Sequence, residues 1–155
     1  MVSGSTSAAA GATALDDADR LAIRELADLY GHVLDAGAWD RLPELFTEDV
    51  VYDLTFYGWG TVAGIDALRA LWTTVEHPLA HHVTNVVIKC DADGTVRVAS
   101  KGIGLRADGT AHSTEYRDVV RRTPRGWRIA CRTAWRRTAE STPGPPGTVT
   151  VGDGR

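Results

Sequence analysis

The feature that most constrains the fold is a run of long strand-type segments in the C-terminal half of the chain. Four of them follow one another, at residues 81–90, 96–106, 112–122 and 127–137. They are rich in β-branched residues or alternate apolar with polar side chains, as strands do. Asp93-Gly94 and Asp108-Gly109 are typical hairpin turns, and a third turn is expected at 124–126. Strands joined by such short turns run antiparallel, so this half predicts a four-stranded meander.

The N-terminal half predicts three helices instead. Ile23, Leu26, Tyr30 and Val33 recur at helical spacing, and Gly37 is a plausible end of this first helix. Segments 39–46 and 65–76 predict two more helices, and the β-type run 50–57 lies between them. Helices followed by long strands are typical of the α+β class. We expect a cone-shaped α+β barrel, in which the three helices pack on a curved antiparallel sheet and enclose a pocket for a small apolar ligand.

Composition places this fold in a single soluble domain. The chain has 155 residues, of which 43% are hydrophobic and 24% charged, as in ordinary globular proteins. Residues 15–137 form the expected domain. Segments 1–14 and 138–155 are rich in small residues and in Pro and Gly, so we expect them to be loose tails. No apolar run approaches the roughly 20 residues that cross a bilayer, and the N-terminus does not resemble a signal peptide, so the expected location is the cytoplasm.

The charges and cysteines argue against two other classes of protein. Eight arginines fall between Arg117 and Arg137, yet the net charge is −3 and these arginines alternate with apolar residues. We interpret them as a solvated sheet face and expect no nucleic-acid partner. Cys90 and Cys131 are too few for a disulfide framework or a structural zinc site, and we expect them to be buried. We expect no metal site.

Two groups of polar residues are candidates for chemistry. Tyr30 lies on the apolar stripe of the first helix, where it either packs with one hydrogen bond or serves a pocket. Asp35, near the end of that helix, is either a surface cap or a pocket acid. His81 and His82 begin a strand, so their side chains point to opposite faces, and periodicity does not decide which one faces the pocket. Histidine backed by a carboxylate is suited to removing a proton near neutral pH.

The last two strands and the loop after the β-type run supply further candidates. On the first of these strands His112, Thr114, Tyr116 and Asp118 share a face that we expect to point inward. The other face, at residues 113, 115, 117, 119 and 121, is expected to be solvated. On the last strand we expect residues 127, 129, 131, 133 and 135 to share a face, on which Trp135 could touch a ligand. Candidates for the pocket mouth are Tyr57, Trp59 and Trp72.

Four stretches, at 29–42, 45–53, 81–86 and 126–129, carry a resemblance to a known family. They read Leu-Tyr-Gly-His-Val-Leu-Asp-Ala-Gly-Ala-Trp-Asp-Arg-Leu, Leu-Phe-Thr-Glu-Asp-Val-Val-Tyr-Asp, His-His-Val-Thr-Asn-Val and Gly-Trp-Arg-Ile. In this order and spacing the chain resembles the SnoaL-like branch of the nuclear transport factor 2-like superfamily, over about residues 18–137. That superfamily includes scytalone dehydratase, bile acid 7α-dehydratase, hexachlorocyclohexane dehydrochlorinase and polyketide cyclases.

The resemblance implies a catalytic set. Several of these lyases use a His–Asp pair, whose positions match His81 and Asp35, and a tyrosine five residues before the aspartate matches Tyr30. The chain departs from scytalone dehydratase at Tyr116, where that enzyme has an asparagine, and at Leu34, where it has a tyrosine. These departures argue against the same substrate.

The function expected from residues and resemblance together is a cofactor-independent dehydratase or cyclase, a lyase or isomerase of small apolar cyclic or polyketide-like molecules. Substrate-binding candidates are His82, Tyr57, Trp59, His112, Tyr116 and Trp135. One alternative is a non-catalytic binding or assembly module on the same fold. Another is an epoxide hydrolase that uses Arg106 and Asp118. A homodimer or higher homo-oligomer is also expected, because long strands with two partly apolar faces usually have something packed on each.

Overall fold

The long helix α1 (Asp17–Asp35) begins and ends where the sequence predicts. The computed structural model describes residues 15–139. The Asp16 carboxylate caps α1 by accepting a hydrogen bond from the Asp19 backbone N–H at 2.7 Å. After Asp35 the chain turns away at Gly37, whose φ of +59° favours glycine. The predicted apolar stripe is buried against the sheet, so packing as well as capping fixes this helix.

The shorter helical segments differ more from their predictions. The segment predicted at 39–46 is divided into a 3₁₀ turn, η1 (Trp39–Arg41), and one turn of α-helix, α2 (Leu42–Leu45). Helix α3 (Ile65–Trp72) ends four residues earlier than the predicted Glu76. The hydroxyls of Thr73 and Thr74 bond to carbonyls of the last turn, which competes with continuation of the helix. The β-type run at 50–57 is also offset, because its last residues form a 3₁₀ turn, η2 (Thr55–Tyr57).

Six strands form one open sheet, in the order β2-β1-β6-β5-β4-β3. Their bounds are β1 (Phe46–Asp53), β2 (Thr61–Ala63), β3 (Ala80–Cys90), β4 (Val96–Leu105), β5 (Ala111–Thr123) and β6 (Gly126–Arg136). The predicted meander corresponds to β3–β6, whereas β2 was not predicted. The α+β class and the cone-shaped arrangement are confirmed, and the sheet is open along its edges.

One expectation about the sheet is wrong, because the sheet is mixed rather than wholly antiparallel. Strand β6 pairs in parallel with β1 and antiparallel with β5. This parallel pair joins the first strand to the last, and such long-range pairing leaves no turn signal in the sequence. The β1–β6 register shifts between Phe46 and Val51, and the β5–β6 register shifts at Val119 and Val120. Both irregularities change which side chains face the interior.

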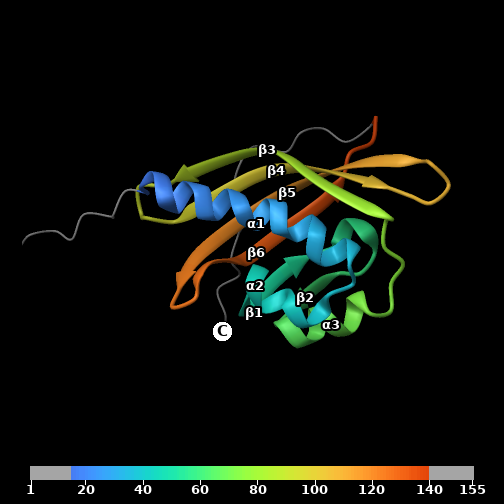
Figure 1. Ribbon diagram of the computed structural model, residues 1–155, viewed down its shortest axis with the longest axis horizontal. Helices are drawn as coiled ribbons and strands as arrows, with labels where there is room; N and C mark the ends of the chain where they lie inside the picture. The colour runs from blue at the N-terminus through green and yellow to red at the C-terminus, as the bar shows by residue number, and fades with distance from the viewer. Residues whose placement is uncertain (1–14, 140–155) are drawn as a thin grey trace, which may run out of the picture.

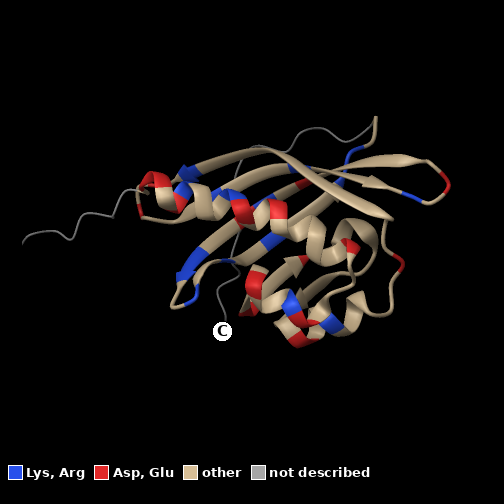
Figure 2. Cartoon of the chain, in the orientation of Figure 1, with Lys and Arg blue, Asp and Glu red and all other residues tan. Residues whose placement is uncertain are grey.

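The curved sheet and the helices enclose one end of the molecule. Figure 1 shows α1 lying along the inner face of β3–β6, with α2, α3 and β2 gathered beyond its C-terminal end. Acidic and basic residues are interspersed over the ribbon in the same view (Figure 2). The predicted tails lie outside the described residues, apart from 138–139. Within residues 15–139, no helix is both long and apolar enough to cross a membrane.

The outer face of the sheet carries apolar side chains among its charges. Val87, Ile103 and Leu105 are exposed there, and they lie beside Lys101 and Arg97 on neighbouring positions of β3 and β4. The homodimer expected from the sequence would cover this face, and it stays a prediction.

Candidate active site

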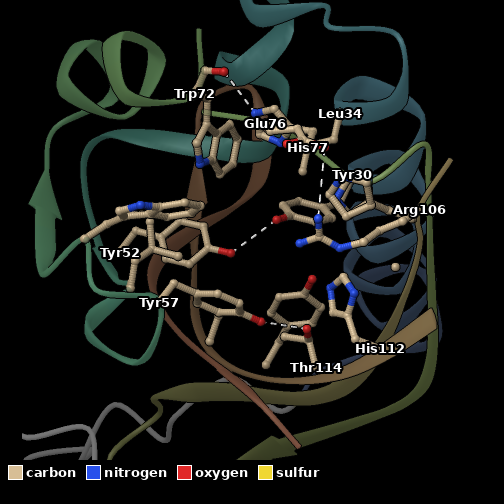
Figure 3. Close-up of a pocket in the computed structure, with 17 residues that line it drawn as sticks. Tyr30, Leu34, Tyr52, Tyr57, Trp72, Glu76, His77, Arg106, His112 and Thr114 are labelled. Atoms are coloured by element: carbon tan, nitrogen blue, oxygen red, sulfur yellow. Dashed lines mark hydrogen bonds and ion pairs between the residues drawn. The ribbon is translucent and has the colours of Figure 1, made fainter. Parts of the chain in front are cut away.

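A pocket opens between the C-terminal end of α1, the end of α3 and the inner face of the sheet (Figure 3). Six of the residues predicted for the site line it: Tyr30, Tyr57, Trp59, His81, His112 and Tyr116. Tyr52, Trp72, His77 and Thr114 add further aromatic and polar groups. Aromatic walls with a few convergent polar atoms are typical of sites for small cyclic molecules.

Asp35 and His81 form a hydrogen-bonded pair at the wall of the pocket. The Nδ1 atom of His81 lies 2.7 Å from Oδ1 of Asp35. The same carboxylate accepts the His81 backbone N–H, at 2.9 and 3.1 Å from its two oxygens. These bonds place the proton on Nδ1, so Nε2 keeps a free lone pair. The contact expected between the two side chains is therefore present, and the His81 side chain is only 11% exposed.

A glycine on α1 makes this pair possible. A Cβ atom added to Gly31 would lie 2.5 Å from the carbonyl oxygen of His81, so only glycine allows α1 to pack so closely on β3. Asp35 lies one helical turn further along α1 and is brought within reach of His81 by this packing.

Three tyrosines form the floor of the pocket. The hydroxyls of Tyr30 and Tyr52 are 3.2 Å apart and point toward each other in Figure 3. The ring of Tyr116 meets that of Tyr30 edge-on, with centroids 5.6 Å apart. Burial is the main cause that raises the pKa of Tyr30, Tyr52 and Tyr116 above the ordinary value for tyrosine. The three phenols therefore stay protonated at neutral pH and can donate hydrogen bonds to a ligand oxygen.

A buried ion pair supports this floor from below. Nε and Nη2 of Arg132 each lie 2.7 Å from an Asp118 oxygen, and both side chains are nearly inaccessible to solvent. The guanidinium carbon of Arg132 lies 4.4 Å from the Tyr30 ring centre and 4.5 Å from that of Tyr116. Nη1 of Arg132 has no hydrogen-bond partner within residues 15–139. The positive charge of Arg132 offsets part of the rise that burial causes in the pKa of Tyr30 and Tyr52. Their hydroxyls are therefore better hydrogen-bond donors.

Glycines on β4 make room for two of the pocket side chains. A Cβ atom on Gly102 would lie 2.7 Å from the Tyr116 ring, and one on Gly104 would lie 2.5 Å from the His112 ring. Both rings therefore lean across β4 rather than standing upright on β5. On the other wall, the Tyr57 hydroxyl is 2.8 Å from Thr114 Oγ1, and Trp59 stacks on the Tyr57 ring.

Two of the predicted substrate-binding residues lie outside the pocket, and these predictions are wrong. His82 follows His81 on β3 and points to the outer face, where it pairs with Ile103 and is exposed. Trp135 also lies on the outer face, beside Glu115 and under the Arg117 guanidinium. The register shift leaves Ala130 without a partner on β5, and this extra residue reverses the alternation of β6 beyond it.

The bulge also explains which residues of β6 were missed. Beyond it Arg132 and Ala134 face inward, instead of the predicted 131, 133 and 135. The expectation of a solvated outer face fails at Glu115, which is 4% exposed and paired with Arg117 and Arg137. Tyr52 could have been found from the sequence, because buried Val50, Tyr52 and Leu54 alternate along β1 and the residue that follows it. His77 belongs to no strand or helix, so no periodicity in the sequence marks it. Its Nε2 is hydrogen-bonded to the Trp72 carbonyl at 2.9 Å.

The epoxide-hydrolase alternative finds little support in this geometry. Asp118 faces Arg132 in the core, whereas Arg106 faces Glu76 at the pocket mouth, so Arg106 and Asp118 do not form the set expected of an epoxide hydrolase. Among residues 15–139, no group of three or more His, Cys, Asp or Glu side chains is arranged to hold a metal ion.

Comparison with known proteins places the chain in a family. The SnoaL-like domain family matches residues 17–133. A proposed aromatic ring hydroxylase from Novosphingobium aromaticivorans is 30% identical, with a TM-score of 0.66 over 79% of this chain and 92% of that one. No curated protein matches the sequence significantly.

Two further solved structures share the fold at lower identity. A proposed scytalone dehydratase from the same organism is 20% identical, with a TM-score of 0.61 over 78% of this chain and 85% of that one. A type 2 hexachlorocyclohexane dehydrochlorinase is 21% identical, with a TM-score of 0.63 over 85% of this chain and 99% of that one. At these identities the likeness extends to the fold alone.

Proposed function

This chain belongs to the SnoaL-like family, and we propose that it is a lyase that removes water from a small cyclic hydroxy-ketone by acid–base catalysis. The observation that carries this proposal is the Asp35–His81 pair beside a floor of protonated tyrosines. The chain supplies the base and the hydrogen-bond donors from its own side chains. The dehydratase and dehydrochlorinase among the proteins of the same fold catalyse eliminations, which supports this class of reaction.

In the proposed reaction, His81 removes a proton from the carbon beside the substrate carbonyl. Asp35 accepts the Nδ1–H bond, which holds Nε2 toward the pocket and stabilises the imidazolium that forms. The C–H electron pair forms the new double bond, and negative charge develops on the carbonyl oxygen. The hydroxyls of Tyr30 and Tyr52 donate hydrogen bonds to that oxygen.

The second half of the reaction returns the enzyme to its starting state. The C–O bond at the next carbon breaks, and the departing hydroxide takes the proton that His81 carries on Nε2. The products are one water molecule and an unsaturated ketone, and the imidazole is neutral again. His81 alone removes the proton and then gives it to the departing hydroxide. The proton and the hydroxyl group must therefore leave from the same face of the substrate ring, next to His81.

A simple substrate tests this proposal. 3-Hydroxy-1-tetralone loses one water to give 1-naphthol, whose fluorescence reports turnover. We expect His81→Asn to lower the rate by about 10²–10⁴-fold, since it removes the base. Tyr30→Phe is expected to lower the rate by about 10²–10³-fold, since it removes one donor to the oxyanion.

The matched control is His82→Asn, which changes the neighbouring residue on the outer face and is expected to retain the wild-type rate. Binding of the ketone without any release of naphthol would support the non-catalytic binding module instead. Equal rates for the wild type and His81→Asn would also contradict the proposal.

A further inference from the structure

A row of basic side chains lies at the open side of the pocket, and two of them, Arg106 and His112, line it. Arg106 follows the end of β4, His112 lies on β5 and Arg136 ends β6, and these strands are neighbours in the sheet. Gly104 pairs with His112, and Thr114 pairs with Arg136, so the row lies one or two residues beyond the floor of the pocket. In Figure 3 the Arg106 guanidinium reaches in front of Tyr30, above His112. We refer to Arg106, His112 and Arg136 as the basic rim.

The two arginines of the rim lack firm partners. Arg106 has only a loose contact, 4.0 Å from the carboxylate of Glu76, whose own side chain is 89% exposed. Arg136 makes no ion pair and no side-chain hydrogen bond within the part of the chain that the structure describes. By contrast, the buried Arg132 on the same strand donates two hydrogen bonds to Asp118, from Nε and Nη2. An arginine without an ion pair and one with only a weak, exposed ion pair, both at the edge of an aromatic pocket, are available to an anionic ligand.

The charges of both arginines act on His112, which lies between them in the sheet. After burial, which is the largest cause, the charges of Arg136 and Arg106 each lower the pKa of the His112 ring. The Arg136 charge also acts on Tyr57, across the pocket wall. Glu76 is the only acidic residue among those that line the pocket, so positive charge predominates at this side of the opening.

From this arrangement we propose that the substrate carries a carboxylate, which binds to Arg106 and Arg136 beside His112. This inference deepens the proposed function, since it assigns a substrate class to the same pocket. One carboxylate, that of Glu76, already lies near Arg106. The Glu76 side chain is exposed, so it can move away when the carboxylate of a ligand binds. A carboxylate fits better than a neutral group because each guanidinium offers paired N–H donors to its two oxygens.

The position of the rim also orients the substrate. A carboxylate held by Arg106 and Arg136 lies at the open side, because both arginines are exposed. The tyrosine floor is buried, and the His81 side chain is only 11% exposed, so both lie further in. The carbonyl and the reacting carbon would then enter first. The acid group thus fixes which end of the ring meets the base, without taking part in proton transfer.

Binding of a matched pair of probes tests this inference without any turnover. 2-Naphthoate and 2-naphthamide have nearly the same shape and differ in charge, and their dissociation constants can be measured by calorimetry. We expect the wild type to bind naphthoate about tenfold more tightly than the amide. Arg106→Gln and Arg136→Gln should each weaken naphthoate binding by about three- to fivefold, as expected for partly exposed ion pairs, and leave amide binding unchanged.

Two further variants sharpen the result. Glu76→Gln removes the carboxylate that competes with the ligand for Arg106. It is expected to tighten naphthoate binding, whereas the two arginine variants weaken it. Arg125→Gln, an exposed arginine at the β5–β6 turn, is the charge control and should have no effect. Equal affinity for the acid and the amide, or equal effects of Arg106→Gln and Arg125→Gln, would overturn the inference. Because His81→Asn should still bind naphthoate, such a failure would be distinct from a failure of the proposed catalysis.

Discussion

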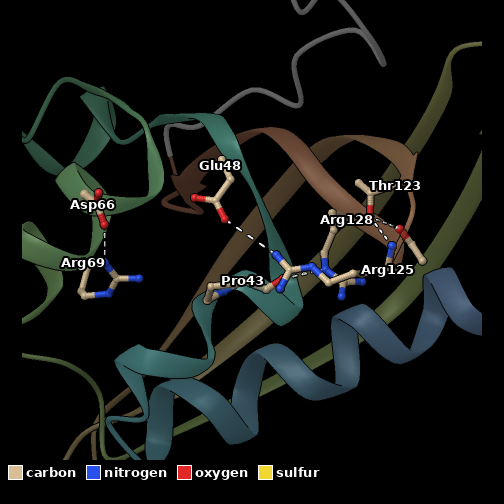
Figure 4. Close-up of polar contacts among 8 residues, drawn as sticks. Pro43, Glu48, Asp66, Arg69, Thr123, Arg125 and Arg128 are labelled. Atoms are coloured by element: carbon tan, nitrogen blue, oxygen red, sulfur yellow. Dashed lines mark hydrogen bonds and ion pairs between the residues drawn. The ribbon is translucent and has the colours of Figure 1, made fainter.

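Two hollows within residues 15–139 differ in how their charged and polar groups are satisfied. The second one lies beside the irregular part of β1 and contains Glu48, Asp49, Arg121, Arg125 and Arg128. Its charges are already paired. Arg121 lies 2.5 Å from Asp49. Arg125 lies 3.7 Å from Glu48, and Arg128 donates a hydrogen bond to the Pro43 carbonyl at 2.7 Å (Figure 4). In the aromatic pocket, the free nitrogen of His81, the phenols and the rim arginines have no such full set of partners.

This difference favours the aromatic pocket as the proposed binding site. In the second hollow the charged groups already have partners, so a ligand there would exchange one set of exposed polar contacts for another. A ligand in the aromatic pocket meets groups that are held in place from behind, by Asp35 for His81 and by Arg132 for the tyrosines. The predictions that follow compare residues of the pocket with matched residues of the hollow or the surface.

The largest expected effect comes from breaking the ion pair beneath the pocket. Asp118→Ala leaves the buried Arg132 charge unpaired, and we expect it to lower the free energy of unfolding by about 3–5 kcal/mol. Asp49→Ala, which removes the exposed partner of Arg121, should change it by less than about 1 kcal/mol. Urea denaturation measures both.

A double variant makes this prediction stricter. In Asp118→Leu with Arg132→Met both charges are absent, so most of the lost stability should return. If Asp118→Ala and Asp49→Ala cost the same, the distinction between a supported pocket floor and a solvated hollow would fail.

A smaller effect is expected from the close approach of α1 to β3. Gly31→Ala gains about 1 kcal/mol in helix propensity. It also forces a methyl group to within 2.5 Å of the His81 carbonyl oxygen, and overpacking of this kind costs about 1–3 kcal/mol. Because the obstacle is backbone, we expect a net loss of stability. We also expect about 10²-fold slower formation of naphthol, because Asp35 and His81 move apart.

Asp28→Ala on the exposed face of the same helix is the control and should change neither quantity. A stability gain in Gly31→Ala with unchanged activity would mean that the Asp35–His81 contact does not depend on this packing.

The sequence predicts the pocket better at its walls than at its floor. The α1 stripe, the hairpin turns and the position of Asp35 follow from local periodicity or from the resemblance, and the structure agrees with them. The parallel pairing of β1 with β6 joins residues far apart in the chain, and no local signal marks it. The bulge at Ala130 lies between the apolar residues Ile129 and Cys131, so the reversal that buries Arg132 and turns Trp135 to the outer face could not be predicted from period alone.

A finer comparison concerns the charges around His112. The charges of Arg136 and Arg106 lower the pKa of this ring, so removing either one favours the protonated imidazole. Arg136→Gln and Arg106→Gln should therefore each raise the pKa of His112 in an NMR titration of the ring protons. Arg125→Gln in the second hollow should leave it unchanged. A fall in the His112 pKa in Arg106→Gln or Arg136→Gln would contradict the placement of these arginines near His112. An equal rise in Arg125→Gln would contradict it too.

The central claim is that Asp35 holds His81 with its free nitrogen directed into the pocket. ¹⁵N NMR of histidine-labelled protein tests it directly, because long-range ¹H–¹⁵N correlations identify which ring nitrogen carries the proton. At pH 8, where free imidazole is neutral, we expect the His81 proton on Nδ1 and a bare Nε2. Asp35→Asn should weaken that preference. A proton on Nε2 in the wild-type protein would contradict the account, because His81 would then have no base to offer the substrate.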